Sequence, residues 1–196
     1  MNTKNLGLLI VIGAIVLLGG CGCSGYNNLV TQDQNVKGKW ADVQSAYQRR
    51  ADLIPSLVNT VKGAANFEKS TLEAVVNARA KATATTIDPA NLTPEQIASF
   101  QKTQGELSGA LSRLLVTVEA YPDLKANQNF RDLQAQLEGT ENRINVARND
   151  FNGAVQEYNT SLKTFPTVIY AGMFGFKEKG YFQAEAGSEK APKIEF

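Results

Sequence analysis

The sequence predicts an all-α protein, an up-and-down four-helix bundle of long helices behind an N-terminal membrane anchor. Apolar residues recur at alternating steps of three and four along four segments, as expected for helices that each bury one face. Glycine, 16 of the 196 residues, is sparse in the middle of the chain and concentrated toward its ends. No stretch shows the convincing period-two alternation of a half-buried strand.

Residues 1–23 form the predicted anchor. Lys4 precedes an uncharged apolar run that begins at Leu6, and a Gly-Gly-Cys sequence ending at Cys21 follows. This layout is typical of a bacterial export signal. Because Leu18-Gly-Gly-Cys21 resembles a lipobox, one interpretation is a lipoprotein that is cut before Cys21 and lipidated on that cysteine. The other is a retained single-pass helix, since the uncharged run is close to the minimum that spans ~30 Å of hydrocarbon at ~1.5 Å per residue.

Both interpretations hold the protein at a membrane, with the bundle outside the cytoplasm. Lys4 is the only charge before the apolar run, and positive charge favours the cytoplasmic side. Cys21 and Cys23 are the only cysteines, and their spacing makes a disulfide within the pair geometrically poor. The domain after the anchor is therefore expected to depend on its own apolar core.

The predicted bundle covers residues 26–166, with helices of about 26, 29, 28 and 36 residues joined by short loops. The fourth apolar seam is the most regular and comprises Phe130, Leu133, Leu137, Thr140, Ile144, Ala147, Phe151, Ala154 and Tyr158. Its mean spacing of ~3.5 is typical of helices that pack nearly parallel to one another. Leu137, Ile144 and Phe151 are accordingly expected to be buried.

Prolines mark the predicted breaks between the helices. Pro55 disfavours helical geometry at the residue before it, which predicts a tight corner at residues 52–54. A single kinked helix through Pro55 is the alternative. Thr93 is predicted to cap the third helix, with Pro94 at its first position and Gln96 completing a capping box. Pro122 and Pro166 are expected to follow the ends of the third and fourth helices.

The sequence carries little of the chemistry of an enzyme. It contains no histidine, the commonest general base and metal ligand. Glu138 and Glu141 have the spacing of carboxylate metal ligands, but a solvated helix face explains them better because the Glu-x-x-His pairs of such sites are absent. Twenty basic against nineteen acidic residues give no excess of positive charge of the kind that binds nucleic acid. We therefore expect no catalysis, cofactor, metal or small-molecule substrate.

Arg50 stands out because the first apolar seam places it in phase with the core. A buried arginine must be paired, since breaking a buried pair costs about 3–5 kcal/mol. Glu141 on the fourth helix is the predicted partner. The alternative is that Arg50 lies near a helix end and extends its guanidinium to water. A buried pair would set helix register and would not indicate catalysis.

Residues 167–196 are predicted to be a C-terminal apolar segment followed by a polar tail. An even number of antiparallel helices returns the chain to its membrane end at the start of this segment. Tyr170, Met173, Phe174 and Phe176 are therefore predicted to form a membrane-proximal apolar patch. The alternative is that these side chains plug the open end of the bundle.

Several blocks of the sequence resemble the LemA family. They are Tyr26-Asn-x-Leu-Val30, Gln48-Arg-Arg-Ala-Asp-Leu-Ile-Pro-Ser-Leu-Val58, Val61-Lys-Gly63, Glu119-Ala-Tyr-Pro-Asp-Leu-Lys-Ala-Asn127, Leu137-Glu-Gly-Thr-Glu-Asn-Arg-Ile144 and Tyr158-Asn159. The resemblance implies a short membrane segment before a helical bundle, and it adds no catalytic residues because the family has no established enzymatic activity. Some relatives are associated with membrane organelle biogenesis, and others occur alongside membrane proteases. The lipobox-like Cys21-Gly-Cys23 departs from the family, since many relatives would not need it.

Two functional hypotheses follow. The first is a membrane-anchored, non-enzymatic scaffold or interaction module that binds an unidentified membrane or envelope protein. The second is an adaptor or regulator of a membrane protease.

Overall fold

The computed structural model describes the backbone of residues 3–63 and 67–184, and within them the side chains of residues 24–63, 67–169 and 171–184. This part of the chain is all-helical, without strands. Its elements are α1 (Thr3–Lys62), α2 (Lys69–Ala84), α3 (Pro94–Val118), α4 (Pro122–Ala126), α5 (Gln128–Lys163) and α6 (Thr167–Tyr170). The all-α prediction is therefore confirmed for these residues.

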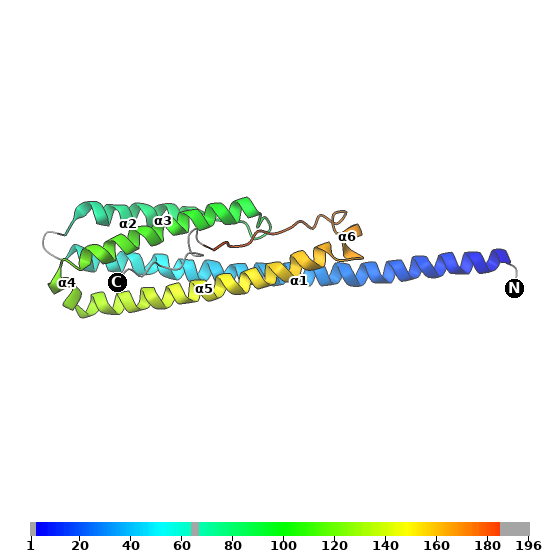
Figure 1. The fold of residues 1–196 in the computed structure, drawn as a ribbon, viewed down its shortest axis with the longest axis horizontal. Helices are drawn as coiled ribbons and strands as arrows, with labels where there is room; N and C mark the ends of the chain where they lie inside the picture. Colours follow the sequence, from blue (N-terminus) through cyan, green and yellow to red (C-terminus); the bar gives the residue numbers. More distant parts are fainter. Residues whose placement is uncertain (1–2, 64–66, 185–196) are drawn as a thin grey trace, which may run out of the picture.

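The long helices pack in two antiparallel pairs (Figure 1). Helix α5 lies along α1, while α2 and α3 form a shorter hairpin that lies against one half of the α1–α5 pair. Close backbone contacts join α1 to α5 and α2 to α3, with fewer between α1 and α2. Beyond the packed domain, α1 projects as one continuous helix toward the N-terminus.

The predicted corner at residues 52–54 is wrong, because α1 continues through Pro55 to Lys62. A proline inside a helix lacks the N–H that would bond to the carbonyl four residues earlier, here that of Ala51. Arg79 of α2 supplies the missing donor, with its Nε 2.8 Å from the Ala51 oxygen. The kinked-helix alternative is the correct one, and the chain reverses after Lys62 instead.

The other helix ends follow local signals. Thr93 caps α3 by accepting a bond from the Gln96 N–H, with Pro94 at the first helical position as predicted. Helix α3 ends at Val118, before the short α4, and the Asn127 side chain caps α5. Helix α5 spans 36 residues and ends just before Pro166.

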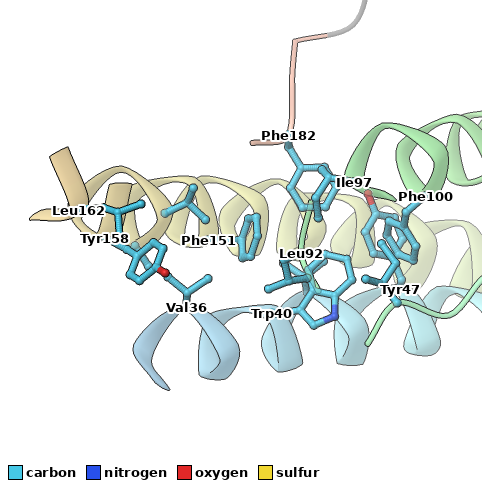
Figure 2. Packing of buried hydrophobic residues seen from close by; sticks show 14 of the residues in the cluster. Val36, Trp40, Tyr47, Leu92, Ile97, Phe100, Phe151, Tyr158, Leu162 and Phe182 are labelled. Atoms are coloured by element: carbon cyan, nitrogen blue, oxygen red, sulfur yellow. The ribbon is translucent and has the colours of Figure 1, made fainter. Parts of the chain in front are cut away.

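One of two apolar clusters in the core is centred on Trp40 of α1 (Figure 2). The rings of Phe100, Phe151 and Phe182 lie 5.2, 5.5 and 6.1 Å from the Trp40 ring. These three phenylalanines come from α3, α5 and an extended C-terminal segment, so the cluster joins most of the fold. Ile144 and Phe151 belong to it, and Leu137 belongs to the second cluster between α1, α2, α3 and α5.

The segment after α6 is part of the packed domain. Residues 177–184, here called the strap, run as extended chain from the α6 end back along α5 (Figure 1). Phe182 points from the strap into the cluster and is 4% exposed. The predicted boundary at residues 166/167 therefore does not mark the edge of the core.

No helix is both long enough and apolar enough to cross a bilayer among the residues whose side chains are described. The predicted anchor, residues 1–23, and the predicted lipidation site Cys21 lie outside those side chains.

Candidate functional site

Two asparagines of α5 hold the strap by its backbone. Asn159 accepts a bond from the N–H of Lys179 at 3.0 Å and donates to the carbonyl of the same residue at 2.9 Å. Asn152 makes the same pair of bonds with Phe182, both at 2.9 Å. Each amide side chain thus satisfies both backbone groups of one residue, as a neighbouring strand would. This recognition depends on the backbone of the strap and not on its side chains.

Helix α3 and the loop before it hold the other side of the strap. Gln101 pairs with both backbone groups of Gln183, at 2.8 and 3.1 Å. The N–H of Gly180 donates to the Leu92 carbonyl at 2.9 Å. A Cβ at position 180 would lie 2.6 Å from the Pro94 Cα, so only glycine allows this close approach.

A buried ion pair joins the strap to α1. Lys179 is 7% exposed, and its Nζ lies 2.7 Å from the Asp33 carboxylate. Lys37 binds the other Asp33 oxygen at 2.7 Å. Burial alone would raise the pKa of Asp33, but its bonds to Lys179 and Lys37 outweigh burial and hold this pKa below its ordinary value. Burial, together with the nearby Asp33 charge, raises the pKa of Tyr158 to about 12.

A groove of about 720 Å³ continues beyond the strap, between α3 and α5. Gln183 and Ala184, the last described residues of the strap, lie at one end of it. Its walls carry amide, hydroxyl and small side chains, including Gln104, Gly105, Ser108, Ser112, Gln134, Asn145 and Asn149. Leu111, Leu137 and Ile144 contribute apolar surface. The groove therefore offers hydrogen-bonding side chains beside an apolar surface.

Arg50 is a buried lining residue of the groove and is 1% exposed. Its Nη1 lies 2.7 Å from both Glu141 Oε1 and Ser108 Oγ, and its Nη2 lies 2.7 Å from Gln104 Oε1. The structure thus brings together the two residues that the sequence analysis paired. The alternative of a guanidinium extended to water at a helix end is wrong, since the Arg50 side chain is buried and α1 continues past it to Lys62.

The two carboxylates with metal-ligand spacing, Glu138 and Glu141, each bond to another side chain. Glu141 is paired with Arg50, and Glu138 accepts a bond from Gln134 at 3.1 Å. Within the described side chains, no group of three or more His, Cys, Asp or Glu residues is arranged to hold a metal ion. The arrangement around Arg50 can hold α1, α3 and α5 in register.

A second surface lies at the end of the domain from which α1 projects. Met173 and Phe174 are 83% and 57% exposed there, while Phe176 packs partly against the core. The rings of Phe174 and Phe176 lie 5.1 and 5.7 Å from Tyr26 of α1. The exposed members, here called the apolar end face, are Phe165, Val168, Ile169, Met173 and Phe174. Of the predicted patch, Phe176 thus covers the core and Met173 faces outward, while the side chain of Tyr170 lies outside the described residues.

Sequence reasoning missed the residues that hold the strap. One signal was available, because Asn145, Asn152 and Asn159 recur at a spacing of seven and so share one face of α5. No signal pointed to Gln101 or to the pairing of Asp33 with Lys179.

Comparison with known proteins places these features in a family. The model of the LemA family matches residues 39–196. Magnetosome proteins MamQ 1 and MamQ 2 of Paramagnetospirillum magneticum are each 26% identical over 181 residues, 84% of this chain and 66% of the relative. Protein LemA of Metamycoplasma hominis is 25% identical over 161 residues, 82% of this chain and 70% of the relative. The chain thus spans just under two thirds of the length of the MamQ proteins.

Proposed function

Because the chain belongs to the LemA family, we propose that it is a membrane-anchored, non-enzymatic scaffold or interaction module. Four long helices form its bundle, and residues 1–23 tether it. The bundle lies outside the cytoplasm and binds another membrane or envelope protein. Arg50, Glu141 and the amides of the groove organise the fold and offer polar contacts; they do not catalyse a reaction.

The apolar end face is the observation that carries this proposal. Its member Phe174 packs against Tyr26, which lies only a few residues beyond the uncharged run that ends at Cys23. Exposed apolar side chains gathered at one end of a domain are typical of a surface that contacts lipid or protein. Lys177 is exposed near this end, where anionic headgroups would attract it, while Lys163 is exposed and paired with Glu178. A tethered bundle would thus rest this end on the bilayer.

Accessibility of spin labels tests the orientation of the bundle. A nitroxide-bearing amino acid is introduced by codon suppression at Met173 and, as control, at Asp123 in α4 at the opposite end of the domain, so that Cys21 and Cys23 stay unchanged. In vesicles of anionic lipid, we expect the label at position 173 to favour lipid-soluble oxygen over a water-soluble nickel chelate. The label at position 123 should favour the chelate. Equal ratios at both positions would contradict a membrane-facing end.

The mature amino terminus distinguishes the two types of anchor. If Cys21 carries lipid, mass spectrometry finds a chain that begins at Cys21, and Cys21→Ala leaves a longer chain that incorporates no labelled palmitate. Recovery of residues 1–18 in the mature protein would instead favour the single-pass helix. Affinity purification from crosslinked membranes then tests the interaction role, and recovery of a protease would favour the adaptor hypothesis.

A further inference from the structure

The residues of α5 that bond to the strap, and the strap residues that they bond, are spaced in a simple ratio along the domain. Asn159 binds Lys179 and Asn152 binds Phe182, so seven residues of helix correspond to three of strap. Seven helical residues rise about 10.5 Å, and three extended residues about 10 Å. The match explains why the same bonding pattern repeats without strain. It also fixes where the next pair of this kind must fall.

The next position on α5 is Asn145, and the next residue of the strap in this register is Glu185. Asn145 is exposed and lines the groove, on the same face of α5 as Asn152 and Asn159. The strap leads directly to it, because Gln183 and Ala184 lie at the groove's near end. We propose that Asn145 binds the N–H and carbonyl of Glu185, and that residues 185–191 occupy the groove between α3 and α5. This assignment does not depend on the membrane function proposed above.

The dimensions and walls of the groove fit this occupant. From Gln101 to Leu115 the α3 wall is about 21 Å long at ~1.5 Å per residue, room for about six or seven extended residues. Twelve residues follow Ala184 in the sequence, enough to fill this length. The backbone bonds of the strap repeat every three residues, with Lys179 and Phe182 bonded to α5 and Gln183 bonded to α3, so the same repeat turns Glu185 toward α5. The residues around Glu185 have small side chains or none: Ala184, Ala186, Gly187 and Ser188. Such small side chains suit walls that include Gly105, Ser108 and Ser112.

The groove is thereby assigned as a site for an extended peptide backbone, with the chain's own C-terminal residues as its ligand. The hydrogen bonds between helix side chains and the strap backbone would continue along residues 185–191. Binding in the groove would then depend more on the backbone of the bound segment than on its side chains. A peptide from a partner could enter only by displacing residues 185–191.

Amide hydrogen exchange of the full chain in detergent micelles, resolved by residue with NMR, tests the assignment. In the unsubstituted protein we expect the Glu185 N–H to exchange at least about fivefold more slowly than an unprotected amide. Asn145→Ala should return this N–H to the unprotected rate while leaving Lys179 and Phe182 protected. Asn142→Ala, an exposed residue of α5 that does not line the groove, is the matched control and should change nothing at Glu185.

Two results would overturn the proposal. One is an unprotected Glu185 N–H in a protein whose Lys179 and Phe182 amides are protected, since the strap would then end at Ala184. The other is a protected Glu185 N–H that Asn145→Ala does not change, because its partner would then be another residue. Protection at Lys179 and Phe182 shows in each case that the variant has folded.

Discussion

The two halves of the α1–α5 pair are covered in different ways. Near Arg50, the helices α2 and α3 lie over the pair, and apolar seams meet in a cluster that includes Leu57, Leu107 and Leu137. Toward α6 the hairpin is too short to reach, and the strap takes its place (Figure 1). The first half is therefore covered by many helical side chains. The second is covered by a strap held through one aromatic anchor, Phe182, a few amide contacts and the ion pair of Lys179 with Asp33.

This difference shows how a helical domain can close without a full set of helices of equal length. A packed helix spreads its stabilisation over many apolar contacts, so no single polar residue decides whether it docks. An extended strap has no internal hydrogen bonds, and each of its buried backbone groups needs a partner from outside. The strap half should therefore respond sharply to single substitutions at its anchor and its amides.

The largest effect is expected at the aromatic anchor. Phe182→Ala should destabilise the domain by about 3–5 kcal/mol, because it leaves a cavity beside Trp40 and Phe151. Phe151→Ala, on α5 in the same cluster, should cost a similar amount. Denaturant unfolding of the two variants measures both. A loss below about 1 kcal/mol for Phe182→Ala alone would mean that the strap does not contribute to the core.

The helical half is tested at its buried ion pair. Arg50→Met and Glu141→Gln, alone and together, should show a coupling free energy of about 1–3 kcal/mol in a double-mutant cycle. The single change Glu141→Gln is destabilising because it leaves the Arg50 guanidinium buried without its carboxylate. Additive effects of the two substitutions would contradict the pairing.

Asn152 tests the amide contacts of the strap separately from its anchor. Asn152→Ala should cost about 1–3 kcal/mol, because the N–H and carbonyl of Phe182 lose their partner. Asn149→Ala is the matched control one turn away, exposed and without a bond to the strap, and should cost less than about 0.5 kcal/mol. Thermal unfolding followed by circular dichroism distinguishes them, and equal losses would count against the amide contacts.

The smallest effect is expected from pH. The pKa of Asp33 is lower in the folded chain than in the unfolded one, so the unfolded state binds its proton first as the solution is acidified. The contribution of Asp33 to stability is therefore present above its ordinary pKa of about 4 and is lost as pH falls through the lower folded value. Asp33→Asn should flatten the fall in unfolding free energy over this range. An unchanged acid profile would mean that Lys179 does not hold this carboxylate in solution.

The sequence predicts the helical half better than the strap half, for physical reasons. The seam through Leu137, Ile144 and Phe151 predicts the buried face of α5 because helical periodicity can be recognised within a short stretch of sequence. The break predicted at Pro55 is wrong because the donor that replaces its missing N–H, Arg79, lies 28 residues after the Ala51 carbonyl that it bonds, and nothing near Pro55 in the sequence indicates it. The strap has no periodicity, because amides on other elements satisfy its backbone, as Asn152 and Gln101 do. The pairing of Arg50 with Glu141 follows from the phase of the first seam and from the cost of an unpaired buried charge.

Truncation tests most directly whether the strap belongs to the folded core. Two chains are compared by denaturant unfolding, one ending at Ala184 and one ending at Pro166, shortly after the end of α5. We expect the chain that ends at Ala184 to keep the stability of the core, while the chain that ends at Pro166 loses several kcal/mol, at least the ~3–5 kcal/mol of its buried anchor. Equal stability of the two chains would contradict the account, because the helices alone would then suffice to close the domain.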